Sequence, residues 1–237
     1  MNGLFENIKG TIKTIQDHSD VMVDELTINP PATLALVEAS EKVSKIKIPS
    51  HIKEFYQAAN GITFIWRIKQ ECDNLTKTKI KEKIGDDGYD LSKPLGALRI
   101  LPLQDMIMNT KWVPVKDTDP DANKPVSFGG KEYTFASFSN MLRPFDFYYT
   151  DNDFQCMSFI VDPQGAEYKF EVVMLDDYFA DWHNSFITDF ETYIKAICAT
   201  QFTIPGRQRL FGKYRGDLQP PLTFDKLNVD LLKPILI

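Results

Sequence analysis

Six aspartates in the second half of the chain fall at predicted turns and strand ends, where their carboxylates can converge on one rim. They are Asp151, Asp153, Asp162, Asp176, Asp177 and Asp181. Such a rim presents phosphate-like anions that suit the substrate cleft of a basic enzyme. Tyr149 and Trp182 lie among the carboxylates and can serve as aromatic anchors. We therefore predict a partner-binding surface formed by these six aspartates and two aromatic residues.

Two other interpretations of these aspartates stay open. Hairpin turns favour Asp regardless of function, so a turn accounts for Asp151 and Asp153, and helix capping accounts for Asp181. Alternatively, two carboxylates about 5 to 10 Å apart in one concave pocket can share general acid and base roles, which is typical of a hydrolase. An open convex rim would instead favour binding.

A calcium site is the first metal chemistry to consider, because Asp117, Asp119 and Asp121 alternate as in the first half of a calcium loop. The rest of that pattern is absent from the sequence. Ala122 occupies the position where the sharp turn needs glycine, and Phe128 occupies the position of the bidentate glutamate. The spacing therefore predicts no metal site here.

The histidines and cysteines form no catalytic pattern. His18, His51 and His183 stand apart from the cysteines, and His183 is expected in the first turn of the last long helix as a satisfied or solvated imidazole. No serine has the sequence of a nucleophile elbow. Cys156 and Cys198 fall in apolar contexts that are typical of buried, inert thiols. We therefore predict no catalytic residue and no cofactor.

Apolar residues at helical spacing predict four longer helices, over residues 3–17, 32–45, 50–59 and 182–198. The residues of the second helix that are available for burial are Leu34, Leu36, Val37 and Val43. The hydroxyl of Ser50 is expected to cap the third helix, and Asn60-Gly61 is expected to end it with left-handed geometry. A short helix is expected after Pro102.

Apolar runs predict strands over residues 62–67, 96–101, 145–149, 154–161 and 168–174. The last three form an antiparallel meander that hairpin turns connect. The first carries bulky apolar residues on both sides, so we expect it in the middle of a sheet. Residues 70–90 are Lys-rich and residues 113–135 are rich in Pro, Asp and Gly, so both are expected to be loop insertions, the former mobile.

The totals describe a globular chain of 237 residues, with 43% hydrophobic and 25% charged content and a net charge of −6. This acidic balance argues against a nucleic-acid binder, whose phosphate contacts need a basic face, although it can also serve solubility alone. The N-terminus lacks a secretory pattern, no apolar run is long enough for a membrane span, and the three cysteines fit no disulfide framework. We therefore expect a cytoplasmic protein that binds neither nucleic acid nor a membrane.

These patterns predict one α+β domain with a mixed, mostly antiparallel sheet flanked by helices, with loop insertions and a C-terminal extension. The domain covers residues 1–203, and the extension covers residues 204–237. The extension begins with a basic run at residues 205–209 and ends in apolar residues. We expect this tail to dock on the main body or on a neighbour, and in the second case it would form a homodimer.

The order of four short motifs resembles the SUKH superfamily, the Smi/Knr-type group of bacterial toxin-immunity proteins and fungal cell-wall regulators. Together the motifs cover roughly residues 40 to 200, with a strand meander between the third and the fourth. They are Ile48-Pro49, Asn60-Gly61-Ile62 followed by Trp66, Ile100-Leu101-Pro102-Leu103, and Ser185-Phe186 within residues 181–190. The order of the motifs is more specific than any one of them alone.

The resemblance implies an α+β domain that neutralises a toxin, commonly a nuclease, by direct binding, and it supplies no shared catalytic residues. We therefore expect an immunity factor that holds a cognate protein toxin, in particular a basic nuclease, by charge complementarity. The fungal branch implies another role, as a regulatory scaffold of cell-wall or envelope synthesis. A hydrolase that uses paired carboxylates is the remaining alternative.

Overall fold

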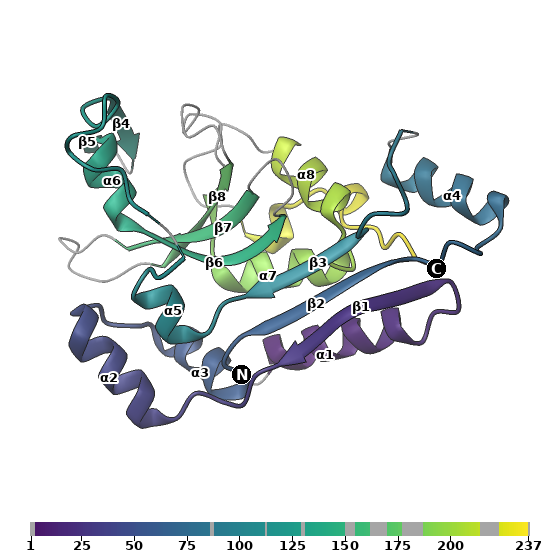
Figure 1. Cartoon of the computed structure of the whole chain (residues 1–237), viewed down its shortest axis with the longest axis horizontal. Helices are drawn as coiled ribbons and strands as arrows, with labels where there is room; N and C mark the ends of the chain where they lie inside the picture. Colours follow the sequence, from purple (N-terminus) through teal and green to yellow (C-terminus); the bar gives the residue numbers. More distant parts are fainter. Residues whose placement is uncertain are drawn as a thin grey trace.

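Antiparallel strands form the main sheet of the described part of the chain, in the order β1-β2-β3-β6-β7-β8-β9 (Figure 1). The computed structural model describes residues 3–85, 88–111, 113–128, 131–149, 155–161, 170–176, 187–213 and 223–236. The strands of the main sheet are β1 Val21–Ile28, β2 Ile62–Ile68, β3 Gly96–Ile100, β6 Leu142–Tyr149, β7 Gln155–Ile160, β8 Glu171–Asp176 and β9 Ile187–Thr188. Two further strands, β4 Pro125–Phe128 and β5 Lys131–Thr134, pair with each other in a separate sheet.

Helices pack on both faces of the β6–β8 part of the sheet. The α-helices are α1 Gly3–Gln16, α2 Leu34–Ser44, α3 Ser50–Ala58, α4 Asn74–Ile84, α5 Leu103–Ile107, α6 Phe135–Met141, α7 Phe190–Ala199 and α8 Ile204–Lys213, and the 3-10 helices are η2 Phe224–Lys226 and η3 Val229–Leu231. Val172 and Val173 are adjacent in β8, so their side chains leave opposite faces. Val172 belongs to the main core with residues of α1 and α7, and Val173 belongs to a second cluster with residues of α6. The predicted α+β fold with a mostly antiparallel sheet flanked by helices is confirmed.

Several predicted elements lie where the apolar spacing placed them. Ile8, Ile12 and Ile15 form the buried stripe of α1, which packs against α7 (Figure 1). β2 is paired on both sides, with β1 and β3, as expected for a strand in the middle of a sheet. The short helix after Pro102 is α5, and the meander of β6, β7 and β8 is antiparallel as predicted.

Two details of the predicted helices are wrong. Leu34 and Val43 of α2 are 61% and 63% exposed, because the buried side of α2 passes through Val37, Ser40 and Glu41 instead. The hydroxyl of Ser50 does not cap α3. Pro49 is the residue that precedes the helix, and Ser50 already lies in its first turn.

The expected loop insertions contain regular structure. Residues 70–90 include α4, which begins after Asp73 and ends at Gly85, so this segment is not an open loop. Residues 113–135 include β4 and β5. α4 and α6 lie at opposite ends of the long axis of the molecule (Figure 1). The strand β1 was not predicted, although it pairs with β2 along its length.

The last long helix begins later than predicted. α7 starts at Phe190, and Asp189 caps it by accepting a hydrogen bond from the backbone N–H of Thr192 at 2.7 Å. Ile187–Thr188, which were expected in the helix, form β9. His183 therefore does not lie in the first turn of this helix, and its own position is outside the described residues.

The turn between α3 and β2 is tied to the turn between β3 and α5. The side-chain oxygen of Asn60 accepts a hydrogen bond from the Leu103 N–H at 2.8 Å, and its Nδ2 donates to the Gln104 Oε1 at 3.2 Å. Gly61 has a φ of 99°, which glycine adopts far more readily than other residues. These bonds connect two of the motifs on which the family resemblance depends.

A buried carboxylate fixes the entrance to α3. Glu41 accepts a hydrogen bond from the Ile48 N–H at 2.8 Å, and its carboxylate lies 2.9 Å from the Lys53 ammonium and 3.8 Å from the Lys47 ammonium. Burial alone would raise the pKa of Glu41, but the Ile48 hydrogen bond and the two lysines lower it below the ordinary value of 4.5. The ionised form of Glu41 therefore stabilises the folded state.

Glu41→Gln is expected to lower the free energy of unfolding at pH 7 by about 1 to 3 kcal/mol, because a charged hydrogen-bond acceptor is lost. The folded-state pKa of Glu41 lies below its unfolded value, so its contribution is present above the ordinary Glu pKa. That contribution disappears as the pH falls through the folded-state pKa. Urea unfolding measured at pH 7 and at pH 3 should show a smaller difference between the variant and the wild type at pH 3. Glu38→Gln, at an exposed position of the same helix, should change neither value.

Candidate functional site

The predicted partner-binding surface is described only at Tyr149 and Asp176, and there only by its backbone. Tyr149 of β6 pairs with Gln155 of β7, and Gln155 pairs with Asp176 of β8. The register therefore places Tyr149 and Asp176 on either side of Gln155, at the same end of the sheet. Two strand spacings separate them, or about 10 Å. The residues of this surface outside the described part are Asp151, Asp153, Asp162, Asp177, Asp181 and Trp182.

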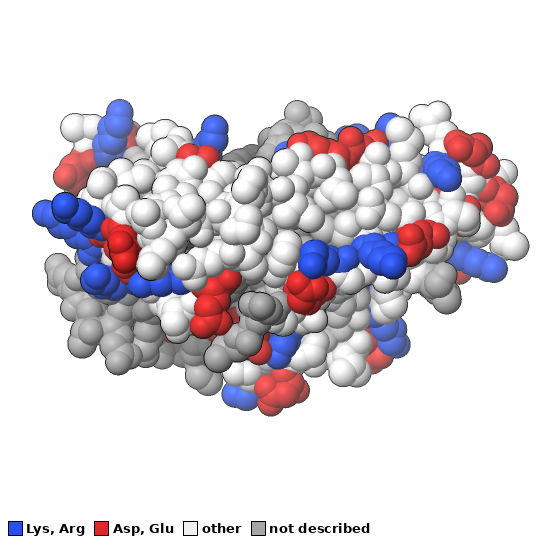
Figure 2. Space-filling model, turned by 90° about the horizontal axis from the view of Figure 1, so that it is seen from below, with Lys and Arg blue, Asp and Glu red and all other residues white. Residues whose placement is uncertain are grey.

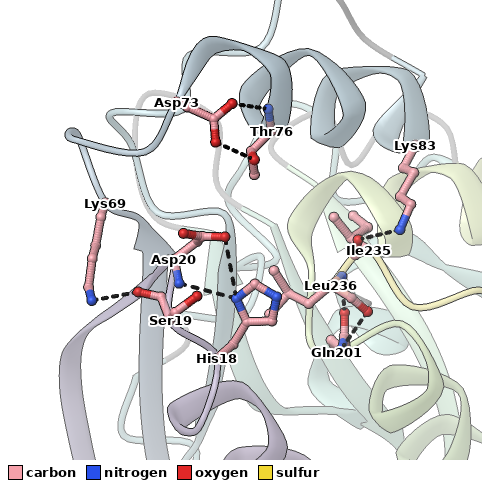
Figure 3. Close-up of polar contacts among 10 residues, drawn as sticks. All are labelled: His18, Ser19, Asp20, Lys69, Asp73, Thr76, Lys83, Gln201, Ile235 and Leu236. Carbon is pink, nitrogen blue, oxygen red and sulfur yellow. Dashed lines mark hydrogen bonds and ion pairs between the residues drawn. The ribbon is translucent and has the colours of Figure 1, made fainter.

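A pocket of about 320 Å³ lies between the α1–β1 turn, α4 and the C-terminal segment (Figure 3). We call it the His18 pocket. The residues that form its walls are His18 and Asp20 of the turn, Thr76, Lys79, Ile80, Glu82 and Lys83 of α4, and Ile235 and Leu236 of the C-terminal segment. Three parts of the chain that are far apart in sequence thus meet at one concave surface.

α4, which forms one wall of the His18 pocket, has a cap at each end. Asp73 accepts hydrogen bonds from the N–H and the hydroxyl of Thr76, at 2.9 and 2.7 Å, and caps the N-terminus. Gly85, with a φ of 69°, ends the helix. Ile80 and Ile84 are buried one turn apart and attach the helix to the main core. Lys81 and Lys83, which lie between them, are half-buried.

The hydrogen bonds of His18 determine which ring nitrogen carries the proton. Its Nδ1 accepts a hydrogen bond from the Asp20 N–H at 3.2 Å and lies 4.0 Å from the Asp20 Oδ2. In the neutral ring the proton must then be on Nε2. Figure 3 shows that this nitrogen is directed toward the side of Leu236. His18 therefore offers a hydrogen-bond donor to the pocket, whereas a general base would need an unprotonated nitrogen there.

The C-terminal segment is fixed in place by hydrogen bonds to its backbone. The Gln201 side chain accepts from the Leu236 N–H at 2.7 Å and donates to the Leu236 carbonyl at 3.3 Å. The Lys83 ammonium donates to the Ile235 carbonyl at 2.9 Å (Figure 3). Ile235 and Leu236 are buried in the main core. The segment is thus a fixed wall of the His18 pocket.

Two cationic side chains stand together at the α4 wall. Lys79 and Lys83 are one helical turn apart, so their side chains are neighbours on the helix surface. Burial of Lys83, and then the charge of Lys79, lower the pKa of Lys83 below its ordinary value. Lys79 and Lys83 therefore line this side of the pocket together with Glu82.

A second pocket, of about 520 Å³, lies on the other side of α4. Lys77 and Lys81 line it together with Tyr89 and Asp90. Lys77 donates a hydrogen bond to the Gln70 carbonyl at 2.6 Å. α4 thus presents one pair of lysines to each of two pockets, and the two pairs can be compared experimentally.

Arg207 and Asp146 form an ion pair whose two side chains are fully buried, with 2.9 Å between Arg207 Nη1 and Asp146 Oδ2. Asp146 also accepts hydrogen bonds from the Tyr193 hydroxyl at 2.5 Å and from the Arg99 N–H at 2.8 Å. The guanidinium donates to the Ala97 carbonyl at 2.6 Å. Because no face of this cluster reaches solvent, its role is structural. The sequence analysis predicted that Arg207 belongs to a basic run in the C-terminal extension, and it did not predict this ion pair.

The remaining candidate residues make local contacts. Asp119 accepts a hydrogen bond from the Lys116 N–H at 2.7 Å, and Asp121 pairs with Lys124 at 3.0 Å. Among the described residues, no three His, Cys, Asp or Glu side chains are grouped as metal ligands. No helix within the described segments has both the length and the apolar character needed to cross a membrane.

Both thiols that were expected to be inert have raised pKa values. Cys156 is buried, and burial raises its pKa well above the ordinary value. Cys198 is partly buried, and loss of solvation raises its pKa to about 12. The two side chains are therefore protonated thiols near pH 7. The predicted burial is confirmed for Cys156, whereas Cys198 is only partly buried.

No protein-family model matches the chain, and no curated protein matches it either. The function must therefore be inferred from geometry. The His18 pocket combines an apolar wall, an N–H donor and two ammonium groups, which is an arrangement for binding. Sequence reasoning missed Lys79 and Lys83, although Asp73 and Gly85 are spaced as the cap and stop of a helix that would have placed them one turn apart.

Proposed function

We propose that the chain is a protein-binding factor of the SUKH type, which neutralises a cognate bacterial toxin, a basic nuclease, by direct contact. The observation that supports this proposal best is the bonded pair of turns at Asn60 and Leu103. The Asn60-Gly61-Ile62 motif and the Ile100-Leu101-Pro102-Leu103 motif are about 40 residues apart in the sequence. β2 and β3 pair antiparallel with Ile62 opposite Ile100, so the two motifs meet at one end of this strand pair, and the hydrogen bond joins them there.

Charge supports the choice of a basic partner. The chain has a net charge of −6, and Tyr149 and Asp176 lie near each other at one end of the sheet. The side of the molecule that carries α1, α2 and β1 has Lys, Arg, Asp and Glu interspersed around a broad uncharged area (Figure 2). That side is therefore less suited to a strongly basic partner than the acidic end of the β6–β8 meander.

The test is co-expression of the chain with each protein encoded beside its gene, followed by growth measurement and co-purification. The partner should be toxic alone, harmless with the chain, and recovered with it. The triple variant Asp151→Asn, Asp153→Asn and Asp176→Asn should weaken binding at least about tenfold and reduce its dependence on salt, because three carboxylates are removed from the interface.

The matched control removes three charges from exposed positions of α1, α2 and α3. It combines Glu6→Gln, Glu38→Gln and Glu54→Gln, and its affinity should stay within about twofold of the wild type. Equal loss in both triple variants would mean that only net charge matters. Failure to rescue growth with any neighbouring protein would contradict the proposed function itself.

A further inference from the structure

We propose that the His18 pocket binds a small organic acid with an apolar body, such as a medium-chain carboxylate. The acid group would lie between Lys79 and Lys83, and the body would lie against Ile80 and the C-terminal wall. This site shares no residue with the acidic surface of the proposed function, and it needs no protein partner.

The apolar part of the ligand fits the walls of the pocket. Ile80, Ile235 and Leu236 are almost fully buried, yet all three line the pocket from two elements that face each other. A volume of about 320 Å³ is at the lower end of the range for small-molecule sites in proteins. An elongated apolar body can therefore replace water along this wall.

The acid group fits the two lysines. Within the described part of the chain, no carboxylate forms an ion pair with Lys79 or Lys83. The Lys83 ammonium donates one hydrogen bond, to the Ile235 carbonyl, and has two more N–H groups to offer. Its lowered pKa reflects burial and the neighbouring Lys79 charge. An anion between the two ammonium groups would offset the mutual repulsion of the lysines through its opposite charge, and the Nε2–H of His18 adds a donor on the opposite wall.

The acidic residues of the pocket form no ion pair with the two lysines among the described residues. The Asp20 carboxylate lies on the side of the His18 ring that faces away from Leu236 (Figure 3). Glu82 is exposed and forms no ion pair with another described residue. The N–H groups of Lys83 that are not bonded to Ile235 are therefore available to a carboxylate.

Titration of the purified chain with octanoate, octylamine and 1-octanol tests the proposal, since the three probes share a tail and differ in head-group charge. Octanoate should give saturable amide chemical-shift changes at Ile80, Lys83 and Leu236, and the other two should bind at least about tenfold more weakly. Phosphatidylglycerol vesicles serve as a control for membrane binding, because their head groups are anionic while their acyl chains are held in a bilayer. The chain should not co-sediment with these vesicles.

A matched pair of double variants separates the pocket from general charge. Lys79→Gln with Lys83→Gln should weaken octanoate binding at least about tenfold, whereas Lys77→Gln with Lys81→Gln, on the other side of the same helix, should leave it unchanged. Far-ultraviolet circular dichroism checks that α4 persists in both. The proposal would be overturned if both double variants weakened octanoate binding equally, or if octylamine bound as tightly as octanoate. It would also be overturned if the chain co-sedimented with vesicles but did not bind octanoate.

Discussion

Replacement of Asp146 by Asn should lower the free energy of unfolding by about 3 to 5 kcal/mol, which is the usual cost of leaving a buried charge without its partner. The Arg207 guanidinium and the Asp146 carboxylate have no exposed surface, so water cannot solvate the arginine after the change. Tyr193 and the Arg99 N–H would also lose a charged acceptor. Urea unfolding followed by tryptophan fluorescence measures the loss.

The same pair should tolerate replacement of both members better than replacement of one. A buried ion pair costs much of its attraction in desolvation, so an apolar pair of similar size can be nearly as stable. Asp146→Leu combined with Arg207→Met should therefore be more stable than Asp146→Asn alone. Glu191→Gln breaks the exposed pair with Lys195 and should cost less than about 1 kcal/mol. Equal losses for Asp146→Asn and Glu191→Gln would show that burial does not set the energy of the inner pair.

The spacing of apolar residues was sufficient to predict which side chains are buried wherever an element packs on the core along one continuous apolar face. The i, i+4 spacing in α1 and the apolar sides of β2 each specify burial without knowledge of the neighbours. It failed for α2, in which the apolar Leu34 and Val43 are exposed while the polar Ser40 and Glu41 are buried beside Val37. Which of two possible stripes is covered depends on the packing of other elements, and a single segment does not contain that information.

α4 shows how composition can hide a helix. Lysines alternate with other residues through the segment, so it resembled a polar loop, while its buried side is reduced to Ile80 and Ile84. The cap at Asp73 and the stop at Gly85 were the stronger signals. β1 was missed for a related reason, since most of its residues are exposed at the edge of the sheet and its apolar alternation is interrupted by a bulge.

The candidate sites were only partly predictable because they are assembled from distant segments. The meander predicts that Tyr149 and Asp176 lie at the same end of the sheet, since each belongs to a strand that pairs with β7. The His18 pocket instead joins residues near 18, near 80 and near 236. The Arg207 pair likewise crosses from α8 to β6. Contacts of this kind follow from the topology of the whole chain.

Gly61→Ala should lower the free energy of unfolding by about 3 kcal/mol or more, because it crowds the backbone that joins two of the family motifs. The φ of 99° is already costly for alanine. In addition, the new Cβ would lie 2.9 Å from the Ile100 carbonyl oxygen and 3.0 Å from the Pro102 nitrogen. Both are backbone atoms of the neighbouring turn, so the bond between Asn60 and Leu103 would have to shift to make room.

Gly85→Ala is the control that separates the cost of steric crowding from the cost of a positive φ. Gly85 also has a positive φ, of 69°, but its added Cβ would meet only the flexible Arg209 side chain, at 3.6 Å. The cost should then be that of left-handed alanine alone, about 1 kcal/mol. Thermal and urea unfolding of the two variants should differ by at least about 2 kcal/mol, because only Gly61 is enclosed by backbone. Similar losses in both would mean that the two turns are less tightly joined than their hydrogen bonds indicate, and would weaken the support that this contact gives to the family resemblance.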